Sequence, residues 1–66
     1  GMRLVAEALQ SSQTPLTAAD VATSLGLSRP TAQRYLADLA AAGRAEVTLR
    51  YGTTGRPEHR YAWRRA

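Results

Sequence analysis

The chain has 66 residues, no cysteine and one histidine, and its net charge is +4. This composition excludes a disulfide framework and argues against a histidine-based metal site or a bound cofactor. A chain of this size buries only about 60% of its extended surface, which leaves little room for a deep substrate pocket. With no apolar run near the roughly 20 residues of a membrane span and no signal peptide, we expect a soluble cytoplasmic domain without membrane contact.

The positive charge is concentrated in the second part of the chain. All nine basic residues are arginine; residues 1–27 hold one of them with two acidic residues, whereas residues 28–66 hold eight with three. A basic segment beside a nearly neutral one is typical of a polyanion-binding face. A GC-rich genome would explain the choice of arginine over lysine, but not this uneven distribution.

Two short helices are predicted in the first part of the chain. Residues 3–11 place apolar side chains at helical spacing, at Leu4, Val5, Ala8 and Leu9. The sequence SSQTP ends this helix, and Leu16 then resumes the apolar pattern as a very short extended segment. Thr17 and Asp20 have the spacing of a capping box, and the second helix ends at Gly26, which readily adopts a left-handed conformation.

The third predicted helix runs from about Arg29 to Ala42, is capped by Ser28 and is ended by Gly43. Pro30 lies in its first turn, where a missing N–H does no harm. Its inner face is formed by Ala32, Leu36, Leu39 and Ala40. The turn before this helix is very short, as in a helix-turn-helix.

Beyond the third helix the apolar period changes from 3.6 to 2. In residues 45–51 apolar side chains alternate with polar ones, at Val47, Leu49 and Tyr51. In residues 59–64, Tyr61 and Trp63 repeat the pattern, and we expect them to face the core against the first and third helices. The turn formers of GTTGRPE, residues 52–58, lie between, which predicts a hairpin with a protruding basic tip.

Three helices followed by a two-stranded hairpin predict an α+β fold, a winged helix-turn-helix that forms one domain over residues 1–66. In this fold the end of the third helix can enter a major groove, and its N-terminal N–H groups can meet phosphate. Gly1 ahead of Met2 is interpreted as a cleavage scar from protein expression, so we expect the chain to be excised from a longer regulator.

The outward side of the third helix carries the first set of predicted DNA contacts. Arg34 is the foremost candidate for a base contact, because arginine can bond guanine O6 and N7 with two hydrogen bonds. Gln33 could read adenine by similar geometry, and Thr31 could meet a thymine methyl group or a phosphate. Ser28 and Arg29 suit phosphate positioning. For each of them, plain solvated surface is the alternative.

The wing supplies the second set of predicted contacts. The residues of its tip could follow the DNA backbone or enter an adjacent minor groove: Thr53, Thr54, Gly55 and Arg56. An arginine at the tip would be attracted to the narrow minor groove of A/T-rich DNA. Arg50 and Arg60, at polar strand positions, could flank it on phosphates.

Two motifs together resemble a known family. SRPTAQRYL (28–36) and RYGTTGRPEHRY (50–61), preceded by the segment L-T-x-x-x-x-A at 16–22, are similar to the C-terminal effector domain of citrate/malate-type bacterial two-component response regulators. The resemblance covers residues 16–63. It implies a transcription factor whose N-terminal receiver, absent from this chain, is phosphorylated by a sensor kinase, in circuits often tied to di- and tricarboxylate uptake.

The resemblance carries over to particular residues. The matching positions are Ser28, Arg29, Thr31 and Arg34 in the recognition helix, and Gly55, Arg56 and Pro57 in the wing. The chain departs from the family by lacking the receiver, so phosphate-dependent switching cannot be inferred from it. Its small Ala32 stands where many such helices place a bulkier apolar residue, which we expect to loosen the core.

Several functions fit a small basic domain of this kind. We favour sequence-specific binding of double-stranded DNA, weak for one domain and stronger for a homodimer on half-sites roughly one helical turn apart. One alternative is a winged-helix module for a protein or RNA partner, which would more often expose an apolar outer face. Another is a stand-alone repressor-type regulator without a receiver. An enzyme is rejected, because no carboxylate pair, activated nucleophile or ligand cluster is present.

Overall fold

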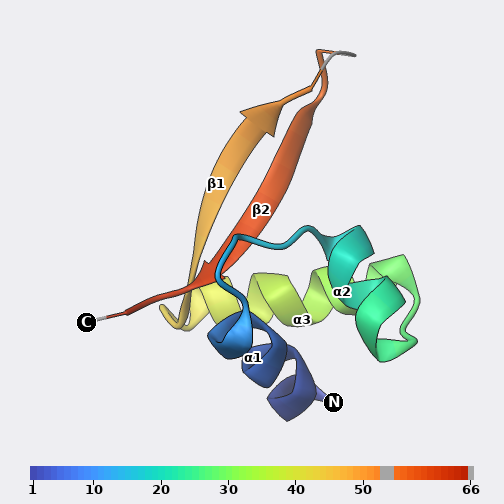
Figure 1. Ribbon diagram of the computed structural model, residues 1–66, viewed down its shortest axis with the longest axis vertical. Helices are drawn as coiled ribbons and strands as arrows, with labels where there is room; N and C mark the ends of the chain where they lie inside the picture. Colours follow the sequence, from blue (N-terminus) through green and yellow to red (C-terminus); the bar gives the residue numbers. More distant parts are fainter. Residues whose placement is uncertain (53–54, 66) are drawn as a thin grey trace.

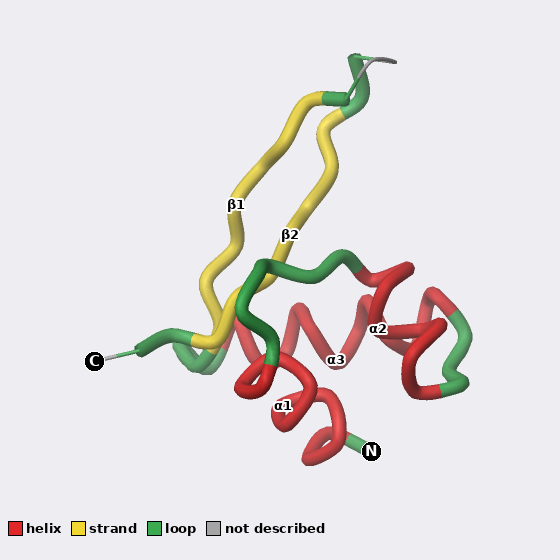
Figure 2. Tube along the Cα trace, in the orientation of Figure 1, coloured by secondary structure: helices red, strands yellow, loops and turns green. Residues whose placement is uncertain are grey.

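The protein is a body of three helices from which a long hairpin rises (Figures 1 and 2). The computed structural model describes residues 1–52 and 55–65. Its elements, in chain order, are α1 (Met2–Ser11), α2 (Ala18–Leu25), α3 (Arg29–Ala41), β1 (Ala45–Tyr51) and β2 (Pro57–Trp63). This architecture confirms the predicted winged helix-turn-helix.

Local sequence signals set the ends of α2 and the start of α3. Thr17 Oγ1 accepts a hydrogen bond from the Asp20 N–H, and the Asp20 carboxylate accepts one from the Thr17 N–H, both at 3.0 Å, which completes the predicted capping box. Gly26 ends α2 in the left-handed region, with φ of 68°. Ser28 Oγ then accepts from the Thr31 N–H at 3.3 Å and caps α3. The α2–α3 turn is therefore as short as predicted.

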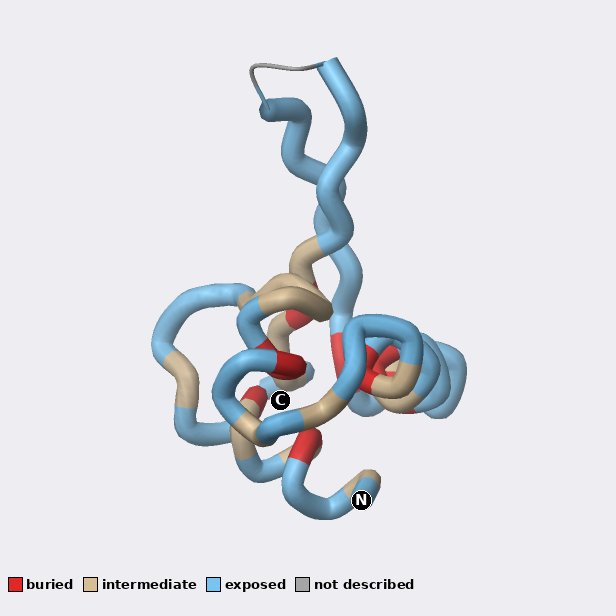
Figure 3. The backbone as a smooth tube through the Cα atoms, turned by 90° about the vertical axis from the view of Figure 1, so that its right-hand side faces the viewer, coloured by how far each residue is buried: buried red, intermediate tan, exposed pale blue. Residues whose placement is uncertain are grey.

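The core lies where the helices meet the base of the hairpin (Figure 3). Its largest fully buried side chains are Leu9, Leu36, Val5 and Val21. Ala32 is also fully buried, at the centre of the inner face of α3. The sequence pattern grouped Leu4 with Val5, but Leu4 is exposed, because consecutive residues are turned by about 100° around a helix.

The sheet joins the hairpin to the loop before α2. β1 and β2 are antiparallel, with Val47 opposite Tyr61. On the other edge of β2, the Leu16 N–H donates to the Tyr61 carbonyl oxygen and the Tyr61 N–H donates to that of Leu16, each at 2.8 Å. Leu16 is thus the short extended segment that the sequence predicted, and it ties the base of the hairpin to the helical body.

The hairpin is longer than the predicted strands. β2 begins at Pro57 rather than residue 59, since Pro57 pairs with Tyr51 and Glu58 pairs with Arg50. A proline is tolerated at the first position of a strand because its missing N–H interrupts no further pairing there.

Only the base of the hairpin is buried (Figure 3). Along the face of the hairpin that carries Tyr61, the exposed fraction of each residue rises from 3% at Tyr61 to 42% at Val47, 51% at Leu49 and 71% at Tyr51. The alternation predicted the shared face of Val47 and Tyr61 correctly, as their pairing shows. Burial ends part of the way up because the strands extend past the helices, and no layer covers the upper part of this face.

We predict that Thr17→Ala destabilises the domain, because the capping box loses its side-chain acceptor. The expected cost is about 1 kcal/mol, which for a domain of this size lowers Tm by roughly 4–8 °C. Thr23→Ala makes the same chemical change at an exposed position within α2 and should leave Tm equal or slightly higher. Thermal unfolding followed by circular dichroism measures both, and equal Tm values for the two variants would contradict the capping role.

Candidate nucleic-acid interface

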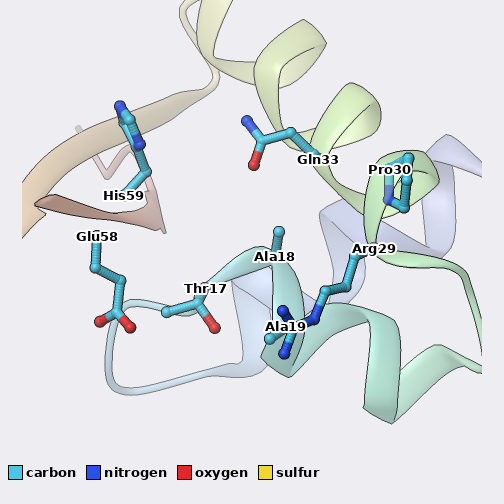
Figure 4. A pocket seen from close by; sticks show the side chains of 8 residues that line it. All are labelled: Thr17, Ala18, Ala19, Arg29, Pro30, Gln33, Glu58 and His59. Atoms are coloured by element: carbon cyan, nitrogen blue, oxygen red, sulfur yellow. The ribbon is translucent and has the colours of Figure 1, made fainter. Parts of the chain in front are cut away.

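One cleft lies between the helical body and the hairpin, and a second lies along the outer part of the hairpin. The first, which we call the helix cleft, has a volume of about 420 Å³ and is lined by Thr17, Ala18, Ala19, Arg29, Pro30, Gln33, Glu58 and His59 (Figure 4). The second, the wing cleft, has a volume of about 440 Å³ and is lined by Arg50, Tyr51, Gly52, Arg56, Pro57, Glu58 and Arg60. Glu58 contributes to the lining of both clefts.

The helix cleft brings together two of the predicted contact residues, Arg29 and Gln33. Both project from the first half of α3, and the Arg29 side chain extends past Ala19 at the start of α2 (Figure 4). Gln33 Nε2 donates a hydrogen bond to Tyr61 Oη at 2.8 Å. The strand alternation correctly predicted Tyr61 in the core, but it did not indicate that the Tyr61 hydroxyl contacts α3. The pairing of Gln33 with Tyr61 joins residues 28 positions apart, so no local pattern could have indicated it.

Ser28 and Thr31 lie together at the start of α3. Ser28 Oγ donates to Thr31 Oγ1 at 2.8 Å while it accepts from the Thr31 N–H. The Ser28 proton is therefore engaged within the helix cap. The Thr31 hydroxyl keeps its own proton, and its side chain is half-buried.

Arg34 lies at the centre of the outward side of α3 and lines neither cleft. The same side of α3 also exposes Gln33, Ala37, Asp38 and Ala41. Gln33 is on the flank of α3 that faces the hairpin, as its bond to Tyr61 requires. A surface with Arg34 at its centre and Gln33 at its wing-side edge is thus presented to solvent.

The wing cleft gathers the predicted arginines of the hairpin. Arg56 follows Gly55, which has a φ of 80°, a conformation suited to glycine. Arg60 Nε donates to Glu58 Oε1 at 2.9 Å, which holds the Arg60 side chain along the strand. Arg50 and Arg60 alternate with the Tyr61 face and so lie on the opposite face of the hairpin. Two further predicted contacts, Thr53 and Thr54, lie outside the described residues.

The arginine side chains without partners are concentrated on α3 and the hairpin. Arg3 pairs with Glu7 and Arg64 with Glu46, each at 3.5 Å. Within residues 1–52 and 55–65, the arginine side chains that take part in no ion pair or hydrogen bond are Arg29, Arg34, Arg44, Arg50 and Arg56. These cationic groups remain available to an external anion, which is the electrostatic footprint of nucleic-acid binding.

Two features are absent from the part of the chain that the structure describes. Among those residues, no group of three or more histidine, cysteine, aspartate or glutamate side chains lies close enough to hold a metal ion. In the same part of the chain, none of the helices has the length and apolar character needed to cross a membrane.

A short α2–α3 turn, a bridging Leu16 and a hairpin wing with arginines define this protein as a winged helix-turn-helix domain. The chain belongs to the IclR helix-turn-helix domain family, which it matches over residues 5–48. That match runs from α1 into β1, so most of the wing lies beyond it.

The relatives of the chain are transcription regulators. Over 60 residues it is 42% identical to the transcriptional regulatory protein CitT of Bacillus subtilis and 40% identical to the probable C4-dicarboxylate response regulator DctR of the same organism. Each alignment covers 91% of this chain and 26% of the relative, so the chain spans about a quarter of their length. These similarities confirm the resemblance to the DNA-binding domains of such regulators.

A solved structure shows the same fold. A possible transcriptional regulator from Methanosarcina mazei superposes with a TM-score of 0.86 and 16% identity, over 92% of this chain and 52% of that one. The matched family is one of helix-turn-helix domains and the relatives are transcription regulators, which supports DNA binding by this domain.

We predict that Glu58→Gln strengthens binding to a polyanion. Among the described residues that line the two clefts, Glu58 is the only acidic one, and it neutralises Arg60. Its loss should tighten binding to heparin about two- to fivefold at 0.1 M salt, since it removes roughly 0.4–1 kcal/mol of repulsion.

Glu7→Gln is the matched control, because it removes the same charge from an exposed pair on α1. Its effect on the heparin affinity should be smaller. Equal gains in the two variants would mean that only net charge matters and that the clefts are not where the polyanion lies.

Proposed function

We propose that this domain reads a specific sequence in double-stranded DNA, with α3 in the major groove and the wing on the backbone or in the adjacent minor groove. One observation carries the proposal: among the described residues, arginine side chains without partners are exposed both on α3, at Arg29 and Arg34, and in the wing cleft, at Arg50 and Arg56. A major groove is wide enough for one helix. A projecting hairpin can follow the neighbouring backbone.

On α3, Arg34 contacts a guanine with two hydrogen bonds, and Gln33 reads a neighbouring adenine. Arg29 binds a phosphate, supported by the free N–H groups of the first turn. Ser28 serves mainly to cap the helix, since its hydroxyl proton is engaged by Thr31. At this position the backbone N–H of Arg29, rather than the Ser28 hydroxyl, meets the phosphate. Thr31 offers its methyl group to a thymine.

At the wing, Arg56 and Gly55 approach the minor groove, together with Thr53 and Thr54. Arg50 and Arg60 lie along the phosphates at its edge. Arg60 exchanges the Glu58 carboxylate for a phosphate oxygen when DNA is bound, which costs little because exposed ion pairs contribute about 0–1 kcal/mol.

The outward side of α3 favours duplex DNA over the other partners of winged-helix modules. Its exposed residues are polar, charged or small, with Gln33, Arg34 and Asp38 among them, whereas a protein-binding surface would have an apolar centre. Double-stranded RNA is disfavoured because its deep, narrow major groove does not admit side chains to the base edges. The domain acts by binding and catalyses no reaction.

In the full-length protein, this domain is the effector of a two-component response regulator in the cytoplasm. The CitT and DctR relatives support this context. An N-terminal receiver would accept phosphate from a sensor kinase and bring two effector domains together on repeated half-sites, in a circuit for di- or tricarboxylate uptake. A stand-alone repressor would have the same DNA interface without the receiver.

We predict that Arg34→Ala lowers affinity for the preferred duplex by about 1–3 kcal/mol and relaxes the preference at one base position. Selection from randomised duplexes at a fixed salt concentration, followed by titration of the selected sequence, measures both effects. Arg3→Ala is the control, because Arg3 is exposed on α1 and pairs with Glu7.

The pattern of loss distinguishes the possible roles of Arg34. Uniform weakening across all sequences would make Arg34 a phosphate contact. Wild-type protein that selects no sequence would contradict the proposed specific reading of duplex DNA.

A further inference from the structure

Gln33 of α3 is held in place by the base of the wing. Its Nε2 donates to Tyr61 Oη at 2.8 Å, which is the only hydrogen bond between side chains of α3 and the hairpin in residues 1–52 and 55–65. The contact is partly buried, although the Gln33 residue as a whole is exposed. One end of the carboxamide is thus fixed by the protein and the other is open to solvent.

The Tyr61 hydroxyl is a well-fixed partner. The residue is only 3% exposed. Its backbone is bonded in both directions to Leu16, at 2.8 Å each, and it lies opposite Val47 in the hairpin. With the ring packed in the core and the backbone tied to two segments, the hydroxyl position is set by the fold.

This contact uses only part of the bonding capacity of the carboxamide. A glutamine side chain has two N–H donors and one acceptor oxygen. Tyr61 accepts from one N–H, which leaves the second N–H and Oε1. Figure 4 shows the Gln33 oxygen directed into the helix cleft and the nitrogen directed away from α2.

Adenine is the base that matches the remaining groups. Its major-groove edge offers the N6 amino group as donor and N7 as acceptor, and a carboxamide meets both with its oxygen and one N–H. An unheld glutamine side chain would first have to lose its rotamer freedom on binding. A carboxamide already held by one N–H has lost part of that freedom in the free domain.

We propose that Tyr61 is a specificity-determining residue that acts by positioning: its buried hydroxyl presets the Gln33 carboxamide for adenine. The inference rests on the proposed function, in which α3 lies in the major groove. It adds that the reading of a DNA base by α3 depends on β2. The lower part of the wing therefore contributes to specificity without contacting the DNA base itself.

The test compares Tyr61→Phe, Gln33→Ala and the double variant by titration on the selected duplex and on its three single-base substitutions at the position that Gln33→Ala affects. Wild-type protein should prefer adenine there. Tyr61→Phe keeps the ring and should reduce that preference about three- to tenfold, as expected for one hydrogen bond. The double variant should show no further loss at this position compared with Gln33→Ala.

Tyr35→Phe is the matched control. Tyr35 is a half-buried tyrosine of α3 that packs against the core, and its loss of a hydroxyl should leave every base preference unchanged. Titrations are made at a temperature at which circular dichroism shows all variants folded.

Gln33→Glu gives a second measurement that does not alter Tyr61. A carboxylate accepts from the Tyr61 O–H but has no N–H, so the preference should change from adenine to cytosine, whose N4 amino group is a donor.

Two results would overturn the inference while the proposed function stands. If Tyr61→Phe keeps the full adenine preference that Gln33→Ala loses, Gln33 reads the base without Tyr61. If Gln33→Ala changes no base preference although Arg34→Ala does, the Gln33–Tyr61 bond is a structural tie only. A wild-type domain that selects no sequence would overturn both this inference and the proposed function.

Discussion

Tyr61 is the residue at which α3, the wing and the loop before α2 are joined. Its ring lies in the core, its backbone pairs with Leu16 on one side and with β1 on the other, and its hydroxyl accepts from Gln33. Because these contacts meet in one residue, the hairpin cannot tilt at its base without disturbing both the core and α3. The base of the wing is therefore held against α3 before any ligand binds, and this preorganisation lowers the entropic cost of binding.

The distribution of charged side chains favours the same interface as the contacts of Tyr61. Three glutamates form ion pairs with arginines. Glu7 pairs with Arg3 and Glu46 with Arg64, and none of these four residues lines the helix cleft or the wing cleft. Glu58 pairs with Arg60, and both line the wing cleft. The cationic groups left without partners among the described residues are mostly on α3 and the hairpin. Each phosphate that such a group neutralises releases condensed counterions, so affinity depends steeply on salt, whereas sequence must be read by the few side chains that reach base edges.

The sequence predicted the parts of the fold that depend on neighbouring residues. The capping box of Thr17 and the left-handed Gly26 bound α2 as expected, because both act within a turn of the helix. The alternation in β1 predicted which side chains share a face, but not that Val47 and Leu49 would be exposed, since burial depends on how far the strands extend beyond the helices. Of the candidate site, the clustering of arginines on two elements was predictable. The Gln33–Tyr61 bond was not, because it arises from the packing of β2 against α3.

In the proposed function, α3 and the wing contact the same side of one duplex at the same time. Hydroxyl-radical footprinting of the wild type and of Arg56→Ala on the selected duplex tests it most directly. We expect two protected patches on one side of the DNA, one along the major groove and one at the adjacent minor groove, with Arg56→Ala losing only the second. A single patch that is identical for both proteins would contradict simultaneous contact by the two elements.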